Sequence, residues 1–505
     1  MLYRKLTIPL NLPKPYNEEI GVNYSHVNLI HEIQNSSKIN ENSIINSFDK
    51  YFTKKISSVI QPTVFIFLND IVPIIYKSKQ KDEGLYQLLR FLDNNVSNFI
   101  YLEDLINRNF IYVNLSKIFL FSGYLTNLIS EDIKLLDILD PDYAMRLNGN
   151  ITFYQNTFDK IDINISDEET VLDNLRKNHR FLKFQILFAL IQGDIDIKRA
   201  SYEFSLLAQA TLNITLQIVE NQINKKYNIK CDQYCIIAYG RFGTFTMTAN
   251  SDLDLVFIHN NYINSHKSNR HIYIDLFRKV IKILSTKTKE GILYEVDTKL
   301  KPSGKYGPVA STFTNFKNYQ VNKSFSWEKI ALKKTRIVST KNEFSSQISK
   351  LTNELNLIPI SYRDISNEIR LMRVNTNKPL SNESIIKRKS PSKWFETKYT
   401  AGGQRDIEFV RFFFQDKLIF KNTLEIDKKI LLLERMEKLF FKLDQIINIC
   451  FLDEKQDNLP SKAINLLNSA TNEKDLGSLK SSVKQGKNEI YNVLNQILER
   501  VEDNF

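Results

Sequence analysis

Two aspartates in the segment SDLDLVFI are the first residues whose types and spacing suggest chemistry. Asp252 and Asp254 are two positions apart in a short β-branched stretch, so a strand would direct both carboxylates to one face. Leu253, Leu255 and Phe257 would then point to the opposite face, which can be buried. Neighbouring carboxylates repel each other unless a proton or a cation neutralises them, and divalent ions with oxygen ligands commonly do so. A solvated edge strand is the alternative interpretation of a bare Asp-x-Asp pattern.

A glycine-bearing turn precedes this pair. The apolar run CIIAYG predicts a strand that ends in the turn Gly240-Arg241-Phe242-Gly243-Thr244. Such a turn offers backbone N–H groups, and Gly243 is expected to let a phosphate approach closely. A phosphate-binding turn just before a carboxylate pair is a much stronger indication than either feature alone.

A third carboxylate lies in the segment ILYEVDTKLK, which predicts another strand. Alternation would place Asp297, Lys299 and Lys301 on one face of it. On a neighbouring strand Asp297 would join the first pair, and three carboxylates can hold two Mg²⁺ ions that assist an in-line phosphoryl displacement. The two lysines would neutralise a departing pyrophosphate. A cross-strand ladder of charges is the alternative.

The rest of the chain predicts mostly helices around a small α/β unit. Helical periodicity extends from about 62 to 225, and residues 181–223 predict two helices joined near Gly193-Asp194. A helix is expected over 273–284, a loop around 387–406, and a helical bundle from 420 to the end. We therefore expect an α+β, mostly helical protein. Its expected parts are a segment of unclear fold at 1–60, a helical connector at 61–190, the α/β domain at 191–345 and a helical domain at 346–505.

Composition indicates a soluble globular protein. The 505 residues are 42% hydrophobic and 25% charged, and we expect neither a signal peptide nor a membrane span. The apolar stretch 62–76 is too short to cross a bilayer and contains Asn69 and Asp70. Cys231, Cys235 and Cys450 predict buried free thiols, and the six histidines have no metal-ligand spacing. The net charge of +12 comes from dispersed lysines, so we expect no nucleic-acid partner. Because we expect neither a signal peptide nor a membrane span, we also expect a cytoplasmic protein.

Several longer segments resemble the glutamine synthetase adenylyltransferase family, a branch of the nucleotidyltransferases. The similarity covers roughly residues 60–505 and looks most like an alphaproteobacterial version. The segments that carry it are MTANSDLDL, YEVDTKLKPSGKYGPVAS, SWEKIALKKTRIV, KYTAGGQRDIEF, FQILFALIQGDI and YEFSLLAQA. The resemblance implies a nucleotidyltransferase domain of the polymerase β-like type between helical domains. Full-length members carry two such domains, and this chain resembles the C-terminal, adenylylating half.

The resemblance also implies an activity and a set of site residues. The activity is transfer of AMP from ATP to a tyrosine of glutamine synthetase, with Mg²⁺ and with a PII-type signalling protein as a partner. Phosphorolytic removal of AMP, or a decayed protein that only binds glutamine synthetase or PII, are the alternatives. Asp252, Asp254 and Asp297 would bind metal, and Asp297 would help to deprotonate the target tyrosine. The implied nucleotide-binding residues are Gly240, Gly243, Thr244, Ser251, Lys299 and Lys301.

Six positions depart from the family's usual residues. Thr244 replaces a Gly or Ser, Thr246 replaces a Glu, and Ala401 replaces a Pro. Arg241, Lys299 and Lys301 exchange basic types with the usual Lys, Arg and Arg, and a Lys in place of an Arg loses bidentate phosphate contacts. The three aspartates are intact, so we expect these departures to affect rate and regulation more than the type of reaction.

Overall fold

The computed structural model describes most of the chain beyond residue 60, in two compact units. The described ranges are 61–78, 81–95, 110–140, 149–163, 167–229, 231–260, 270–340, 343–377, 396–398, 400–414, 423–450 and 471–504, with a few single positions beside them. One unit comprises Met1–Arg146 and Ile446–Leu476, and the other comprises Leu147–Gln445 and Gly477–Phe505. The three boundaries between the four expected parts stay predictions. The expected segment 1–60 lies almost entirely outside the described residues.

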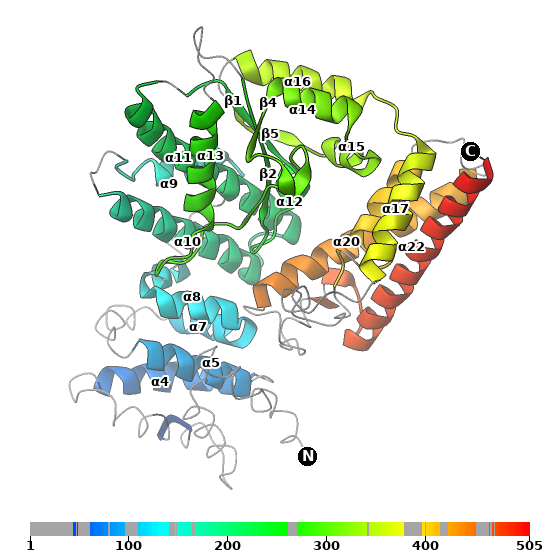
Figure 1. The fold of residues 1–505 in the computed structure, drawn as a ribbon. Helices are drawn as coiled ribbons and strands as arrows, with labels where there is room; N and C mark the ends of the chain where they lie inside the picture. Colours follow the sequence, from blue (N-terminus) through cyan, green and yellow to red (C-terminus); the bar gives the residue numbers. More distant parts are fainter. Residues whose placement is uncertain are drawn as a thin grey trace. The chain divides into compact units, whose positions relative to one another are not determined.

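The first unit is helical where it is described. Its elements are α4 (Gln61–Tyr76), α5 (Lys81–Asn94), α7 (Phe110–Phe121), α8 (Gly123–Glu131) and the 3₁₀ helix η4 (Ile133–Leu139) (Figure 1). A Cβ at Gly84 of α5 would lie 2.7 Å from Ile75 and 2.8 Å from Leu120, so this glycine lets three helices pack closely. The apolar stretch at 62–76 is therefore a helix packed into the core of this unit.

The second unit begins with helices that carry the sheet. They are α9 (Ile151–Phe158), α10 (Glu168–Gln192) and α11 (Ile197–Tyr227). The predicted joint is confirmed: α10 ends at Gly193, whose φ of 86° is readily adopted only by glycine. Helix α11 starts at Asp196, whose side chain accepts the Arg199 N–H at 2.7 Å.

A mixed five-stranded sheet follows. Its strands are β1 (Tyr234–Ala238), β2 (Leu253–His259), β3 (Val296–Asp297), β4 (Ala310–Thr312) and β5 (Arg336–Thr340). The order is β3-β2-β1-β5, with β4 also beside β2. Strand β1 is antiparallel to β2 and β5, whereas β2 is parallel to β3 and β4. The expected helix at 273–284 is α13 (Arg270–Ser285).

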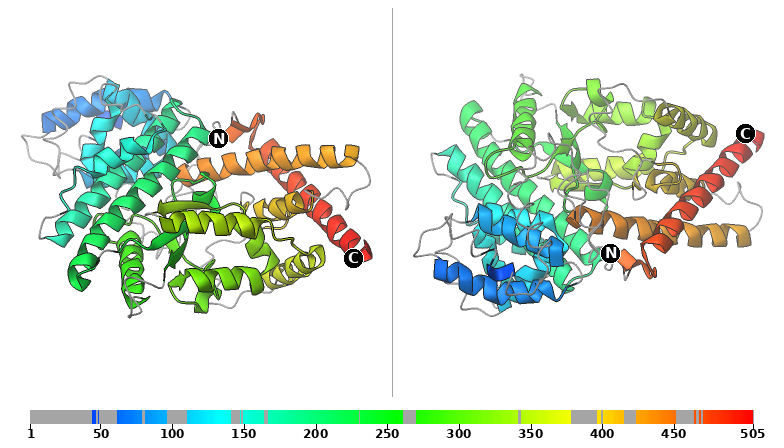
Figure 2. Two further views of the ribbon diagram at one scale, coloured as in Figure 1. Left: turned by 90° about the horizontal axis from the view of Figure 1, so that it is seen from above. Right: turned by 90° about the horizontal axis from the view of Figure 1, so that it is seen from below.

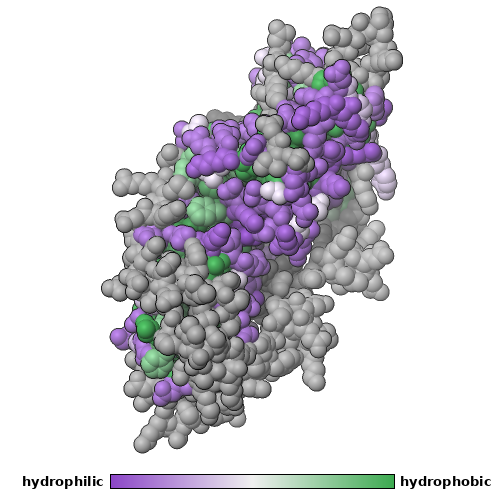
Figure 3. Space-filling model, turned by 90° about the vertical axis from the view of Figure 1, so that its left-hand side faces the viewer, coloured by the Kyte–Doolittle hydropathy of each residue, from purple (hydrophilic) through white to green (hydrophobic). Residues whose placement is uncertain are grey.

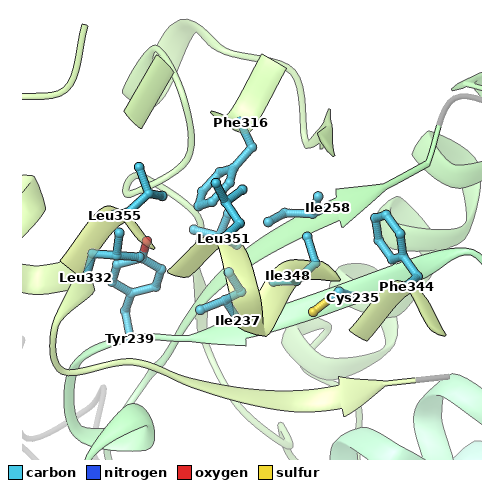
Figure 4. Packing of buried hydrophobic residues seen from close by; sticks show 11 residues of the cluster. Cys235, Ile237, Tyr239, Ile258, Phe316, Leu332, Phe344, Ile348, Leu351 and Leu355 are labelled. Atoms are coloured by element: carbon cyan, nitrogen blue, oxygen red, sulfur yellow. The ribbon is translucent and has the colours of Figure 1, made fainter. Parts of the chain in front are cut away.

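Helices cover both faces of this sheet. On one face Tyr234 packs against Phe277 of α13 and donates its hydroxyl to Glu220 of α11 at 2.5 Å. On the other face lie α14 (Phe313–Asn322), α15 (Ser326–Leu332) and α16 (Glu343–Asn356). They pack on the buried cluster drawn in Figure 4, which takes alternate residues of the strands, among them Cys235, Ile237, Val256 and Ile258. Cys231 and Cys235 are buried free thiols, as predicted, and the side chain of Cys450 lies outside the described residues.

Long helices complete the second unit (Figures 1 and 2). They are α17 (Tyr362–Asn377), α19 (Gln404–Phe414), α20 (Thr423–Cys450) and α22 (Leu476–Asn504). The loop expected around 387–406 is confirmed for the described residues between 396 and 403, but α19 already begins at Gln404, and 387–395 lie outside the described residues. Gln445 of α20 donates to the hydroxyl of Ser201 and to the carbonyl of Met247, which holds α20 against α11 and the segment before β2.

The described residues thus form an α+β protein that is mostly helical, with one small mixed sheet. Where Figure 3 colours residues by hydropathy, most of those in view are hydrophilic, and the apolar ones are scattered. Among the described helices, none combines the length and apolar character needed to span a membrane.

Candidate active site

The three aspartates predicted from the sequence lie together at the edge of the sheet. Strands β2 and β3 pair in parallel with Asp254 opposite Asp297, and Asp252 directly precedes β2. Each aspartate offers one carboxylate oxygen, and these oxygens all lie within 4.8 Å of one another. All three residues are partly exposed, so the cluster is open to solvent on one side.

The position of Asp254 follows from how β2 is buried. Leu253, Leu255 and Phe257 are buried, as predicted, but Val256 and Ile258 on the other face are buried as well. Asp254 shares its face with Val256 and Ile258 and is the one residue of β2 that is not buried. The strand therefore emerges from the core at the end where the carboxylates gather.

The electrostatics of the cluster create a demand for positive charge. Burial and the nearby carboxylates of Asp252 and Asp297 together raise the pKa of Asp254 to about 6. The cations Lys398 and Lys299 act in the opposite direction. A carboxylate that resists ionisation beside two others is stabilised by a bound divalent ion, whose preferred ligands are oxygen atoms.

The predicted turn between β1 and β2 is the one-turn helix α12 (Gly240–Gly243). Gly240 has a φ of 56°, and a Cβ there would overlap with Oδ2 of Asp254. The glycine therefore allows the turn to lie directly against the carboxylate.

The structure explains in a different way from the expected one why residue 243 is a glycine. A Cβ at Gly243 would lie 2.7 Å from the carbonyls of Ala238 and Lys334, so packing against backbone excludes a side chain. Its N–H donates to Tyr239 O at 2.9 Å, and the N–H of Thr244 donates to Gly240 O at 3.2 Å. The expected free approach of a phosphate at Gly243 is therefore not what the structure offers there.

The hydroxyl residues after the turn also have structural partners. Thr244 Oγ1 donates to Gly240 O at 3.1 Å and lies 2.8 Å from Thr246 Oγ1. Thr244 and Thr246, two of the positions that depart from the family pattern, thus interact with each other. Ser251 Oγ accepts the Thr248 N–H at 2.9 Å, which holds the turn before β2.

Beyond Asp297 the chain turns, and the expected long strand is wrong in its extent. Strand β3 contains only Val296–Asp297, so Lys299 and Lys301 do not share its face by alternation. The chain leaves the sheet through backbone bonds of a turn, Lys301 N to Thr298 O and Gly304 N to Lys301 O. Lys299 nevertheless reaches Asp297, with its N–H 2.7 Å from Oδ1 and its Nζ 2.5 Å from Oδ2. Lys301 is buried and donates to Thr298 Oγ1 at 3.3 Å. Burial lowers its pKa, while the nearby charge of Asp297 acts to raise it.

Residues far along the chain join the site, and the sequence assigned them no role. The positive charge of Lys398 lowers the pKa of Asp254. The preceding residue, Thr397, donates its hydroxyl to Asp444 of α20 at 2.7 Å. Asp444 also forms an ion pair with Arg241 of α12. The segment KYTAGGQRDIEF and the turn containing Arg241 were visible as motifs, but Asp444 is one acid in an amphipathic helix and gave no signal.

A carboxylate cluster on two parallel strands, beside a glycine turn and several cations, is typical of proteins that bind a divalent ion together with phosphate groups. Residues 112–351 match the model of the glutamate-ammonia ligase adenylyltransferase family. The match contains all five strands and the three aspartates.

Curated relatives carry one name, bifunctional glutamine synthetase adenylyltransferase/adenylyl-removing enzyme. That of Bradyrhizobium diazoefficiens is 27% identical over 358 residues, covering 66% of this chain and 35% of the relative. That of Bartonella quintana is 26% identical over 461 residues, covering 85% and 46%. That of Brucella suis is 32% identical over 256 residues, covering 48% and 25%. The chain thus matches less than half the length of each of these relatives.

Proposed function

We propose that this chain is a Mg²⁺-dependent nucleotidyltransferase that moves AMP from ATP to a tyrosine of glutamine synthetase and releases pyrophosphate. The observation that carries the proposal is the cluster of Asp252, Asp254 and Asp297, which lies inside the segment of the family match. The names of the relatives support the acceptor protein and the transferred group. We infer that the sheet with its flanking helices is a nucleotidyltransferase domain of the polymerase β-like type.

The residues present fit a divalent cation. Three carboxylates offer oxygen ligands within 4.8 Å of one another, and burial with two neighbouring carboxylates raises the pKa of Asp254, which a bound cation would counteract. Asp252, Asp254 and Asp297 would hold the ion, and the sequence pattern suits two such ions. Bound there, Mg²⁺ would neutralise phosphate oxygens and stabilise the charge that develops during in-line displacement.

The chain's own groups have defined tasks in this reaction. The phenolic oxygen of the acceptor forms a bond to the α-phosphorus while the bond to the bridging oxygen of pyrophosphate breaks. Asp297 accepts the phenolic proton, which then passes to water. Lys299, whose side chain is 74% exposed, can leave Asp297 and follow the negative charge of the departing pyrophosphate.

The remaining site residues position the nucleotide. Gly240 brings the backbone of α12 against the aspartates, and Gly243, Thr244 and Ser251 keep the two turns around β2 in shape. We propose that the triphosphate lies along this edge, with Lys301 contributing to the positive field from its buried position.

We also propose the setting in which the reaction takes place. Glutamine synthetase is the protein substrate, a PII-type signalling protein is the regulatory partner, and nitrogen assimilation in the cytoplasm is the process controlled. Neither nucleic acid nor a membrane has a part in this proposal.

Phosphorolytic removal of AMP is a second candidate, because the relatives' shared name includes an adenylyl-removing activity. The two reactions use the same kind of site, with phosphate in place of the tyrosine hydroxyl and ADP as the product. The resemblance of YEVDTKLKPSG to the adenylylating half favours addition for this chain.

The deciding experiment supplies ATP labelled at the α-phosphate, Mg²⁺ and glutamine synthetase from the same source. We expect label on a tyrosine of glutamine synthetase with the wild-type chain and none with the D252N/D254N double variant. Release of ADP from adenylylated glutamine synthetase on addition of phosphate, without labelling from ATP, would assign the removing reaction instead. If glutamine synthetase is neither labelled nor deadenylylated, both proposals are wrong.

A further inference from the structure

A carboxylate from the C-terminal helices is bound to two segments that border the aspartate cluster. Asp444 lies on α20, about two hundred residues from the turn α12, and forms an ion pair with Arg241 there. It also accepts the Thr397 hydroxyl at 2.7 Å and the Gln404 side-chain amide at 2.6 Å. Charge-assisted hydrogen bonds of this kind fix geometry more firmly than neutral ones.

The first of the two segments is the turn against Asp254. Arg241 directly follows Gly240, the residue whose missing Cβ makes room for the Asp254 carboxylate. The carbonyl of Arg241 accepts the Thr246 N–H at 2.9 Å, so a shift of Arg241 would also move the end of the turn. Asp444 thus restrains the backbone that lies against a metal-ligand candidate.

The second segment is the loop between residues 396 and 404. Besides its two contacts with Asp444, the loop closes on itself through Gln404 N to Thr397 O at 2.7 Å. Lys487 of α22 donates to Glu396 O at 2.5 Å, and a Cβ at Gly402 would overlap with the backbone of Lys487. Lys398 therefore projects from a loop that is fixed on two sides, next to a residue that is itself bound to Asp444.

We propose that Asp444 is a positioning residue that fixes α12 and the loop carrying Lys398 beside the three aspartates, so that Lys398 binds the triphosphate. The candidate site is then completed by residues outside the expected domain 191–345. This inference rests on the proposed nucleotidyl transfer for its substrate, but its structural part is independent of any activity.

The structural part is tested by hydrogen–deuterium exchange on the full chain. In D444N we expect faster exchange in peptides covering 240–246 and 396–404. T397V removes the bond from Thr397 to Asp444 and the bond that Thr397 Oγ1 accepts from the Gln404 amide, and it leaves the Arg241–Asp444 ion pair in place. In this variant we expect faster exchange in 396–404 alone. Glu434 is exposed on the same helix, so E434Q is the matched control and should leave both peptides unchanged. Unchanged exchange of both peptides in D444N, at an unchanged melting temperature, would overturn the proposal.

The functional part is tested by the Michaelis constant for MgATP. We expect K398Q and D444N each to raise KM about tenfold, the size of one lost charge-assisted contact, with a smaller effect on kcat. Because part of the effect of Asp444 passes through Lys398, the double variant should raise KM by less than the product of the two single effects. K398R should recover part of the loss. Multiplying effects in the double variant would overturn the role of Asp444 as a positioning residue.

These outcomes separate the two levels of inference. If wild-type protein neither binds MgATP nor transfers AMP, the proposed function and the role of Lys398 fail, and the exchange measurements still decide what Asp444 does. If transfer occurs and K398Q has wild-type KM, only the inference about Lys398 fails.

Discussion

Gly240 lies so close to Asp254 that a Cβ on the glycine would overlap with the carboxylate oxygen Oδ2. The same glycine has a φ of 56°, in the left-handed region that other residues adopt only at a cost. The backbone conformation of residue 240 and its close approach to Asp254 thus both require a glycine. The glycine allows the turn α12 to lie against the candidate metal site.

The first prediction concerns this contact. G240A should lower the free energy of unfolding by about 1–2 kcal/mol through its backbone conformation and should also displace Asp254. We expect Mn²⁺ or Mg²⁺ binding, measured by calorimetry, to weaken at least tenfold. The matched control is G193A, because Gly193 has a φ of 86° and nothing within 4 Å of the added Cβ. G193A should be destabilised similarly but bind metal as the wild type does. Equal metal affinity in both variants would contradict the prediction.

The second prediction is a pH dependence of stability without divalent ions. The folded-state pKa of Asp254 is raised to about 6, above its unfolded value, because of burial and the carboxylates of Asp252 and Asp297. The folded state therefore binds the proton more tightly, and this contribution to stability is lost as pH rises from about 4 to about 6. The loss is bounded by about 3 kcal/mol, since one pKa unit corresponds to about 1.4 kcal/mol.

Urea unfolding between pH 4 and 7 measures this dependence. D254N should remove the part of the pH dependence of the free energy of unfolding that comes from Asp254. Saturating Mg²⁺ should raise the free energy of unfolding most at the upper end of the pH range. An identical pH slope in wild type and D254N would show that Asp254 does not titrate in this range.

The third prediction concerns Arg336, which supports the far side of the same turn. Its Nε donates to Phe242 O at 3.0 Å, and its guanidinium lies 3.9 Å from the ring centre of Phe245. Phe245 has a φ of 58°, so its backbone conformation needs support. Burial lowers the pKa of Arg336 to about 10, and its planar group cannot be replaced by an ammonium ion.

We therefore expect R336K to lower the free energy of unfolding by about 2 kcal/mol, measured in urea. Arg411 forms an exposed pair with Glu437, so R411K is the control and should change stability by less than about 0.5 kcal/mol. Equal effects of the two substitutions would argue against a supporting role for Arg336.

The fourth prediction separates two uses of Lys299. Its Nζ donates a hydrogen bond to Oδ2 of Asp297, an oxygen that could also bind a metal ion. The side chain of Lys299 is mostly exposed. K299M should leave stability within about 0.5 kcal/mol. It should raise the affinity for Mn²⁺ alone severalfold, because a competing cation is removed. Pyrophosphate inhibition should weaken in the same variant. Weaker Mn²⁺ binding in K299M would contradict competition at Asp297.

The sequence predicted those features that depend on neighbouring residues. The joint at Gly193, the strands around Asp254 and the convergence of Asp252 with Asp254 all follow from local periodicity and backbone preference. The extent of β3 did not, because alternation continued through Lys299 and Lys301 while the backbone turned after Asp297. Tertiary context decided there between a strand and a turn.

Contacts between distant residues were beyond such reasoning. A side chain at position 243 is excluded in part by the carbonyl of Lys334, which is distant in the sequence. The ion-pair partner of Arg241 lies on α20. Neither leaves a pattern in its own segment. The motif around Lys398 was recognised, but only the structure relates it to Asp254.

The ion pair between Arg241 and Asp444 also has a consequence for the order in which the protein folds. The three aspartates lie between 252 and 297, and a growing chain completes all five strands of the sheet long before α20 is synthesised. Closing so long a loop is slow, because its entropy is lost before the contact forms. A nascent chain would therefore bind a divalent ion before it can hold a nucleotide in the finished site.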